Sequence, residues 1–580
     1  MRQVFIYVTI LLAIAVPVAA QDLESSERGP STAASSEAIF DRSRIDRTFN
    51  ASLAELLTRY PTCSAGVREF IGQLQLQNDP SREYVFVSPI PQPEPKSAPD
   101  RQCLGRAARL RRQFAEQLVR LAKLAVKANP NLAFRLLNEA SLHDPNHRLA
   151  KAITRNRVHA KIDVKARAGR TAYPEFGWPK GKYFVVNSPN YSIVSNAEKA
   201  NVTRLAENLE LLNAAWRQVF FEHWSSTRDL ARAISRVGAP RMPKDTFRIV
   251  LFASKEDYVN VIRRYEKRAR ITQGIYIPKT RVAYFHCGDD DELGSTWKHE
   301  ATHQLFAETG RGVRDASLID NFWLLEGLAT YMESLQLRPG YSMVGGLEAD
   351  RLQFARYRTL GGIGAVSLQT LTAMSQRELQ QRNDIPVIYS QSAGVTHFLV
   401  RNHRNAFMRY VDAVYSGRDT KGTLTAATGL TFDELEDEYK RYLMIDDAGL
   451  RSLDSRATIR NLSLACTKAT DAAVKNIPLE NVHWFDLGLT SVTDDGLVRL
   501  GTATKLTQLS LFHTKITDVT VRRLANASEL VEIDLSGTSI TDASVPILMA
   551  LPKLKSVDLA DTKLSAGALQ KIRSRFPSTD

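Results

Sequence analysis

This chain is poor in the two residue types that build most thiolate and imidazole sites. It contains 4 cysteines and 11 histidines in 580 residues, and no two cysteines stand in a C-x-x-C arrangement. A thiolate zinc site and a thioredoxin-like redox motif are therefore not indicated. Because histidine is rare, a short string that holds two of them at ligand spacing is informative.

The sequence also lacks a recognisable nucleic-acid-binding module, although its formal net charge is +14. Lysine and arginine are spread along the chain, so we expect no nucleic-acid partner. We interpret the charge as a solvated basic surface. Contact with anionic envelope polymers or acidic substrates is the alternative.

After residue 20 the sequence has no stretch long and apolar enough to cross a membrane. Residues 1–20 are typical of a signal peptide: Arg2 precedes the short apolar run Val4–Val16, and small residues precede a cleavage site at Gln21. We therefore expect an exported protein of the periplasm, the cell envelope or the exterior, with no transmembrane segment after cleavage. An uncleaved anchor is the alternative.

Export permits disulfide bonds. Cys63 and Cys103 form the expected pair, because both lie in the N-terminal region and flank the same proline-rich stretch, residues 88–99.

Two of the histidines stand in the string His-Glu-Ala-Thr-His at 299–303. Residues i and i+4 of an α-helix share a face, so His299 and His303 can aim at one point. Catalytic zinc has three protein ligands and one open position held by water, whose pKa falls to roughly 7. We predict that both histidines bind zinc and that Glu300, beside them, is the general base. A solvated helix face is the alternative.

The third ligand is predicted to be Glu326. It stands in the run 322–329, which is otherwise typical of a buried helix. An unpaired carboxylate there would be costly, and a metal partner removes that cost. A partly exposed helical glutamate is the alternative.

The first string, followed by Trp-Leu-Leu-Glu-Gly-Leu-Ala-Thr-Tyr-Met-Glu at 323–333, resembles the gluzincin zinc metallopeptidases. The likeness is to the aminopeptidase N-like branch and to related bacterial gluzincin-like proteins of unassigned function. Motifs match over 295–333, and the order of elements matches over 183–445. The resemblance implies zinc bound by His299, His303 and Glu326.

The same resemblance implies further roles. Glu300 would be the base, Glu333 would orient a ligand histidine, and Tyr389 would stabilise the oxyanion. Leu325 stands where the aminopeptidase branch has asparagine, and no G-x-M-E-N string precedes the zinc helix. The resemblance therefore does not extend to aminopeptidase specificity.

The C-terminal segment repeats with a period of 24 residues. The pattern that begins at Leu506 and ends in Thr517-Asp518 recurs, and five copies fit within 455–580. We predict five leucine-rich repeats in a short α/β solenoid, with threonine where asparagine is usual. They are either a stabilising appendage or a surface for a protein partner. A boundary near 446–452 predicts that a chain ending near 452 would still fold and bind zinc.

The expected protein is thus a multidomain α+β chain. Its predicted parts are a signal peptide (1–20), a disordered leader with a short helix and a proline-rich linker (21–99), a tetratricopeptide-like helical hairpin (100–165), a gluzincin-like domain with a small sheet and a helical lobe (183–445), and leucine-rich repeats (455–580).

Together the motifs predict an exported zinc metallopeptidase that hydrolyses protein or peptide substrates with a metal-activated water. The alternative is a non-enzymatic envelope scaffold whose zinc site is structural or vestigial. Glu300 favours the enzyme, because a structural site has no need of a base.

Overall fold

The computed structural model describes residues 33–76, 79, 81–242, 246–266, 272–287, 296–309, 319–453 and 456–577. Helices make up 53% and strands 11% of a multidomain α+β protein with several sheets. The expected signal peptide lies outside the described residues. None of the helices described is long and apolar enough to span a bilayer.

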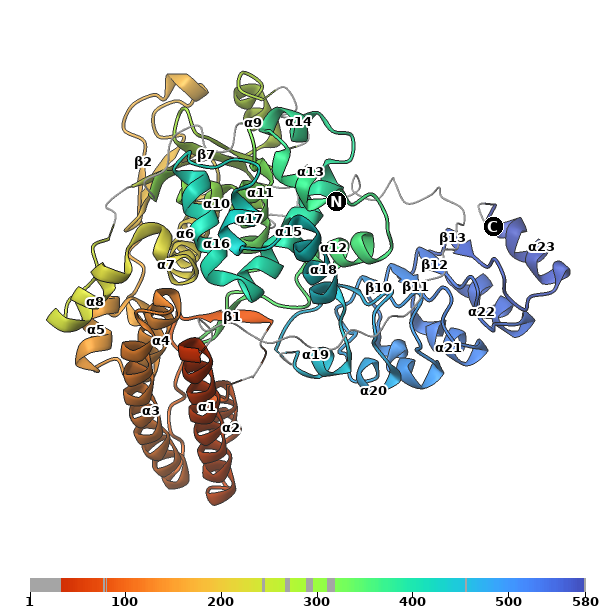
Figure 1. Cartoon of the computed structure of the whole chain (residues 1–580), viewed down its shortest axis with the longest axis horizontal. Coiled ribbons are helices and arrows are strands. Elements are labelled where there is room, and N and C mark those ends of the chain that lie inside the picture. Colours follow the sequence, from red (N-terminus) through yellow and green to blue (C-terminus); the bar gives the residue numbers. More distant parts are fainter. Residues whose placement is uncertain are drawn as a thin grey trace.

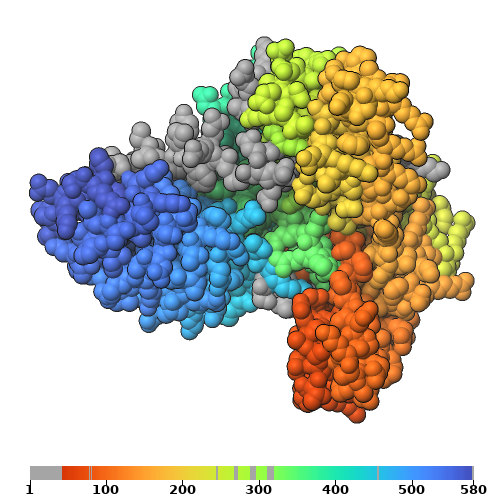
Figure 2. All heavy atoms as spheres, turned by 180° about the vertical axis from the view of Figure 1, so that it is seen from behind, coloured from red at the N-terminus to blue at the C-terminus, as the bar shows by residue number. Residues whose placement is uncertain are grey.

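Two arms leave a central body (Figure 1). The helices α1, α2 and α3 form one arm, and a row of short parallel strands with their helices forms the other. The view from behind shows the same two arms as separate lobes (Figure 2).

The N-terminal arm is helical earlier than we expected. Its helices are α1 (Ala33–Arg59), α2 (Ala65–Leu74) and α3 (Ala98–Ala125), and α4 (Pro130–His143) and α5 (Arg148–Thr154) follow them in the chain. The structure thus has a helix from Ala33 onward, where the sequence predicted a disordered leader before the short helix. The reason is tertiary: Phe49 of α1 stacks on Phe114 of α3 with ring centroids 4.1 Å apart, and Arg42 donates to buried Glu139 of α4 at 2.5 and 2.8 Å.

A strand that the sequence did not predict ties this arm to the central body. The strand β1 (Arg82–Val85) pairs antiparallel with β8 (Ser342–Gly345). Arg82 is fully buried, and its guanidinium lies 2.6 Å from Asp79 and 2.7 Å from Glu348. A short strand whose partner is far along the chain has no local signature, and a buried arginine obscures it further.

The central sheet has six strands in the order β2-β3-β4-β5-β7-β6. The strands β6 and β7 form an antiparallel hairpin before α10, with Tyr276 opposite Ala283. The strand β6 lies at the edge of the sheet. The strands are β2 (Lys165–Ala168), β3 (Phe184–Asn187), β4 (Tyr191–Ser195), β5 (Phe247–Phe252), β6 (Gly274–Ile277) and β7 (Val282–His286).

The helices α6 (Lys199–Val219) and α10 pack on this sheet, and a lobe of further helices follows. Gly327 allows α11 and α15 to approach closely, because a Cβ there would collide with the Thr396 hydroxyl and lie 2.9 Å from the Ser392 carbonyl oxygen. The lobe comprises α10 (Thr296–Thr309), α11 (Phe322–Glu333), α12 (Asp350–Leu360), α13 (Leu368–Ala373), α14 (Gln376–Gln381), α15 (Ile385–Asn402), α16 (Arg404–Tyr415), α17 (Thr423–Thr428), α18 (Phe432–Leu443) and α19 (Asp447–Arg451).

The C-terminal arm is a five-stranded, wholly parallel sheet in which each strand pairs with the next. The 24-residue period places one short strand in each repeat. The strands are β9 (Asn461–Ser463), β10 (Trp484–Asp486), β11 (Gln508–Ser510), β12 (Glu532–Asp534) and β13 (Ser556–Asp558), and the helices between and after them include α20 (Asp471–Val474), α21 (Asp518–Arg523), α22 (Val545–Ala550) and α23 (Ala566–Arg575).

Two kinds of threonine stabilise this arm. Thr514 and its equivalents donate from the hydroxyl to a carbonyl within the turn, which in Thr514 is that of Leu511 at 2.6 Å. The threonines of the Thr-Asp pairs bond to the aspartate of the preceding repeat: both the amide and the hydroxyl of Thr493 donate to Asp471, at 2.8 and 2.6 Å. Each repeat is thus bonded to its neighbour by side chains as well as by strand pairing.

The N-terminal arm contains the two cysteines of the expected disulfide. Cys63 and Cys103 are both buried, and both are free thiols in this structure. Burial, together with the neighbouring Cys63 thiol, raises the pKa of the Cys103 thiol to about 12. We predict that the pair oxidises to a disulfide in protein folded in an oxidising compartment. Peptide mapping without reductant should recover the two cysteines as one linked peptide, whereas recovery of both as free thiols would exclude the bond.

Candidate metal centre

The predicted ligands meet where α10 crosses α11. His299 and His303 stand one turn apart on α10, and Glu326 faces them from α11. Their potential ligand atoms all lie within 4.8 Å of one another. The Nε2 atoms of the two histidines are 3.1 Å apart, and Glu326 Oε2 is 3.2 Å from His299 Nε2 and 3.7 Å from His303 Nε2.

These separations suit a small tetrahedral cation. Zinc bonds of about 2.0–2.1 Å place the ligand atoms of a tetrahedron about 3.3–3.4 Å apart, and the three measured distances bracket that value. Two imidazole nitrogens and one carboxylate oxygen are also a donor set that zinc accepts at catalytic sites, with one position left for water. The residues present therefore fit a zinc ion.

The carboxylates around His299 make the cluster receptive to positive charge. The side chain of Glu326 is 7% exposed and that of His299 11%. Burial opposes ionisation of Glu326, but the positive charge of His303 and the hydrogen bond from His299 outweigh it and hold the Glu326 pKa well below its usual range. Burial likewise opposes protonation of His299, yet hydrogen bonds to Glu326 and Glu333 raise its pKa to about 10. A metal dication can take the place of this proton.

The orientation of the His299 ring is fixed at Nδ1, the nitrogen that faces away from the ligand cluster. His299 Nδ1 donates to Glu333 Oε1 at 2.8 Å, which leaves Nε2 directed at the ligand cluster. Arg351 Nε of α12 donates to the other oxygen of Glu333 at 3.0 Å. Burial raises the pKa of Glu333, but Arg351 and His299 outweigh it and lower the value to about 2. Glu333 is thus a charged acceptor, the role that the resemblance implied for it.

Glu300 is held apart from the ligand atoms. Its Oε2 accepts a hydrogen bond of 2.7 Å from the amide of Tyr276 on the edge strand β6. The carboxylate therefore lies between the α10 helix and the sheet edge, next to the ligand histidine that precedes it.

The structure also brings Tyr389 to the cluster. Its ring lies nearly parallel to that of His299, with centroids 6.3 Å apart and planes 12° apart. Burial raises the Tyr389 pKa well above its usual value, and the carboxylate of Glu326 raises it further. Tyr389 is therefore a neutral donor at neutral pH.

Two residues around the centre were not predicted from the sequence. Arg351 binds Glu333 from a separate helix. Lys298 Nζ donates to the carbonyl oxygens of Glu333 and Leu335 at 3.2 and 2.8 Å, and so holds the end of α11 against α10. Neither residue belongs to a local motif, because each acts through tertiary contact with the end of α11.

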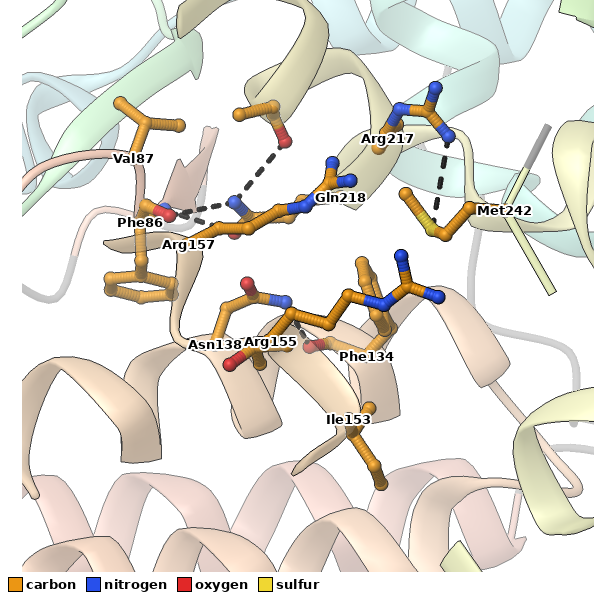
Figure 3. Close-up of a pocket in the computed structure, with 12 residues that line it drawn as sticks. Phe86, Val87, Phe134, Asn138, Ile153, Arg155, Arg157, Arg217, Gln218 and Met242 are labelled. Carbon is orange, nitrogen blue, oxygen red and sulfur yellow. Dashed lines mark hydrogen bonds between the residues drawn. The ribbon is translucent and has the colours of Figure 1, made fainter. Parts of the chain in front are cut away.

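The described part of the structure also contains a hollow lined by other residues. It is lined by Phe86 and by residues of α4, α5 and α6 (Figure 3). Its cavity volume is about 30 Å³. None of the predicted site residues lines it, so it is distinct from the metal centre.

Comparison with known proteins gives similarity but no function. A family model described as a protein of unknown function (DUF1570) matches residues 294–418. That segment runs from α10 to α16 and includes the three candidate ligands, Glu300 and Tyr389. No curated protein matches the chain.

The geometry predicts about one zinc per chain in purified protein, measured by elemental analysis. His303→Ala should lose the metal because it removes one of three ligands. His513→Asn is the matched control, since His513 is exposed in the C-terminal arm, and it should keep full occupancy. Full occupancy in both His299→Ala and His303→Ala would exclude this site.

Proposed function

We propose that the protein is an exported zinc metallopeptidase of gluzincin type, which hydrolyses peptide bonds in protein or peptide substrates. One observation carries the proposal: a carboxylate, Glu300, and a neutral hydroxyl, Tyr389, lie beside the candidate ligand cluster without belonging to it. Glu300 and Tyr389 have no role in a purely structural zinc site, which is closed by protein ligands. The resemblance of the two motifs to gluzincins supports the same reaction.

In this proposal each residue of the site has a separate role in hydrolysis. Zinc would polarise the scissile carbonyl and lower the pKa of an attacking water to roughly 7. Glu300 takes a proton from that water as it attacks, and then delivers the proton to the leaving amine nitrogen. Tyr389 donates a hydrogen bond to the carbonyl oxygen as negative charge develops there. Glu333 keeps His299 in the tautomer that presents Nε2.

The C-terminal arm fits the same proposal. Its parallel strands, 24-residue period and turn threonines are those expected of a short leucine-rich-repeat solenoid. We propose that it binds a protein partner or substrate at the cell envelope or in the periplasm. Such repeats expose a continuous sheet face along which extended partners bind.

The substitution Glu300→Gln tests the role of the base separately from metal binding. The amide keeps the shape of the side chain and removes its basic oxygen, so hydrolysis of a peptide library should fall by at least about 10²–10⁴-fold. Zinc content should remain that of wild type. Retained activity in the variant would place the base elsewhere.

The wild-type protein also tests the non-enzymatic alternative. If zinc-loaded, folded wild type cleaves no peptide in a broad library, the envelope-scaffold function replaces the peptidase. Cleavage that Glu300→Gln abolishes, with zinc still bound, supports the peptidase.

A further inference from the structure

The helix α12 lies between the metal centre and the C-terminal arm (Figure 1). Arg351, its second residue, reaches Glu333 beside His299. The residues that follow contact β9 and β10 of the parallel sheet. The two parts therefore share one helix, although the sequence favoured their independence.

Polar contacts fix α12 against the first strand of the arm. Asn461 Nδ2 donates to Asp350 Oδ1 at 3.0 Å. The amide of Ser463 donates to Gln353 Oε1 at 3.2 Å, and Arg356 Nη1 donates to the carbonyl of Ser463 at 3.0 Å. Gln353 and Arg356 are 0% and 1% exposed, so their two bonds to Ser463 are buried, where losing one partner is costly. The bond between Asn461 and Asp350 lies at the exposed edge of this contact.

Aromatic packing fixes α12 against the second strand. Trp484 of β10 stacks on Phe354, with ring centroids 4.9 Å apart and planes 12° apart. The same indole meets the ring of Tyr357 edge-on at 5.7 Å. Trp484 thus contacts two residues of α12 that lie one turn apart, which restrains both the position and the rotation of the helix.

The expected boundary near 446–452 is bonded to the arm and packed against it. Thr470 donates to Asp447 from its amide at 2.8 Å and from its hydroxyl at 2.5 Å, which repeats the bond between neighbouring repeats. Ile445, Leu450 and Leu347, the last in the loop before α12, belong to the same apolar core as the leucines of the arm. These contacts argue against a separable arm.

We infer that the C-terminal arm is a support of the metal centre: it holds α12 in place, and Arg351 of α12 then holds Glu333 against His299. Arg351 and Trp484 are positioning residues in this arrangement. The inference rests on the proposed zinc site and goes beyond it. It also assigns the face of β9 and β10 that carries Asn461 and Trp484 to α12, so a partner of the arm must bind elsewhere on it.

Zinc affinity in the full-length chain tests the inference, measured by competition with a chromogenic chelator. Arg351→Gln should weaken zinc binding about 10- to 100-fold, the usual effect of removing a group that orients a ligand. Trp484→Ala should weaken it about 3- to 10-fold, because α12 then shifts without losing Arg351. Trp484→Phe keeps a ring on Phe354 and should restore affinity.

A double variant and a control make the result specific. Arg351→Gln with Trp484→Ala should bind no more weakly than Arg351→Gln alone, since both changes act through one contact. Phe512→Ala, which removes a ring of the same arm that lies against His513, should leave zinc affinity unchanged. Unchanged affinity in folded Trp484→Ala would overturn the inference.

A second variant tests the inference independently if Trp484→Ala does not fold. Asn461→Asp places a carboxylate beside Asp350 and should displace the start of α12 by repulsion, with the same loss of affinity. Unchanged affinity in that variant would likewise overturn the inference. If wild-type protein binds no zinc at all, the proposed function fails instead, and the two failures are thereby distinguished.

Discussion

Two carboxylates, Glu326 and Glu333, are buried on opposite sides of one imidazole, and the site depends on compensating their charge. Their hydrogen bonds to His299 are 3.2 and 2.8 Å long. Buried carboxylates persist only when cations or donors surround them. Arg351 compensates the charge of Glu333, the outer carboxylate. His299 and His303 compensate the charge of Glu326, the inner carboxylate of the ligand cluster. A metal ion at that cluster satisfies the inner carboxylate and both histidines at once.

Several features of the fold follow from this constraint. The two helices that carry the ligands must lie close together, and Lys298 and the small residue Gly327 hold α11 between its neighbours. The outer carboxylate needs a cation from outside both helices, which α12 supplies. Because α12 is in turn packed against β9 and β10, the centre is connected to an arm that shares no sequence motif with it.

Local patterns in the sequence predicted the parts that are determined locally. The i, i+4 spacing of His299 and His303 on a helix and the strands of the 24-residue repeat both appear in the structure. The sequence did not predict the helix at the start of α1 or the strand β1, because both are stabilised by contacts with distant segments, such as that of Arg42 with Glu139. Arg351 was missed for the same reason: nothing near it indicates that its partner is Glu333.

X-ray absorption at the zinc edge tests the central claim most directly. Full-length protein loaded with one zinc should give a spectrum of nitrogen and oxygen neighbours at about 2.0–2.1 Å, with the outer-shell scattering of two imidazoles and no sulfur. His303→Ala should remove one imidazole from that spectrum. A sulfur neighbour at about 2.3 Å, or a wild-type spectrum without imidazole scattering, would contradict a centre built from His299, His303 and Glu326.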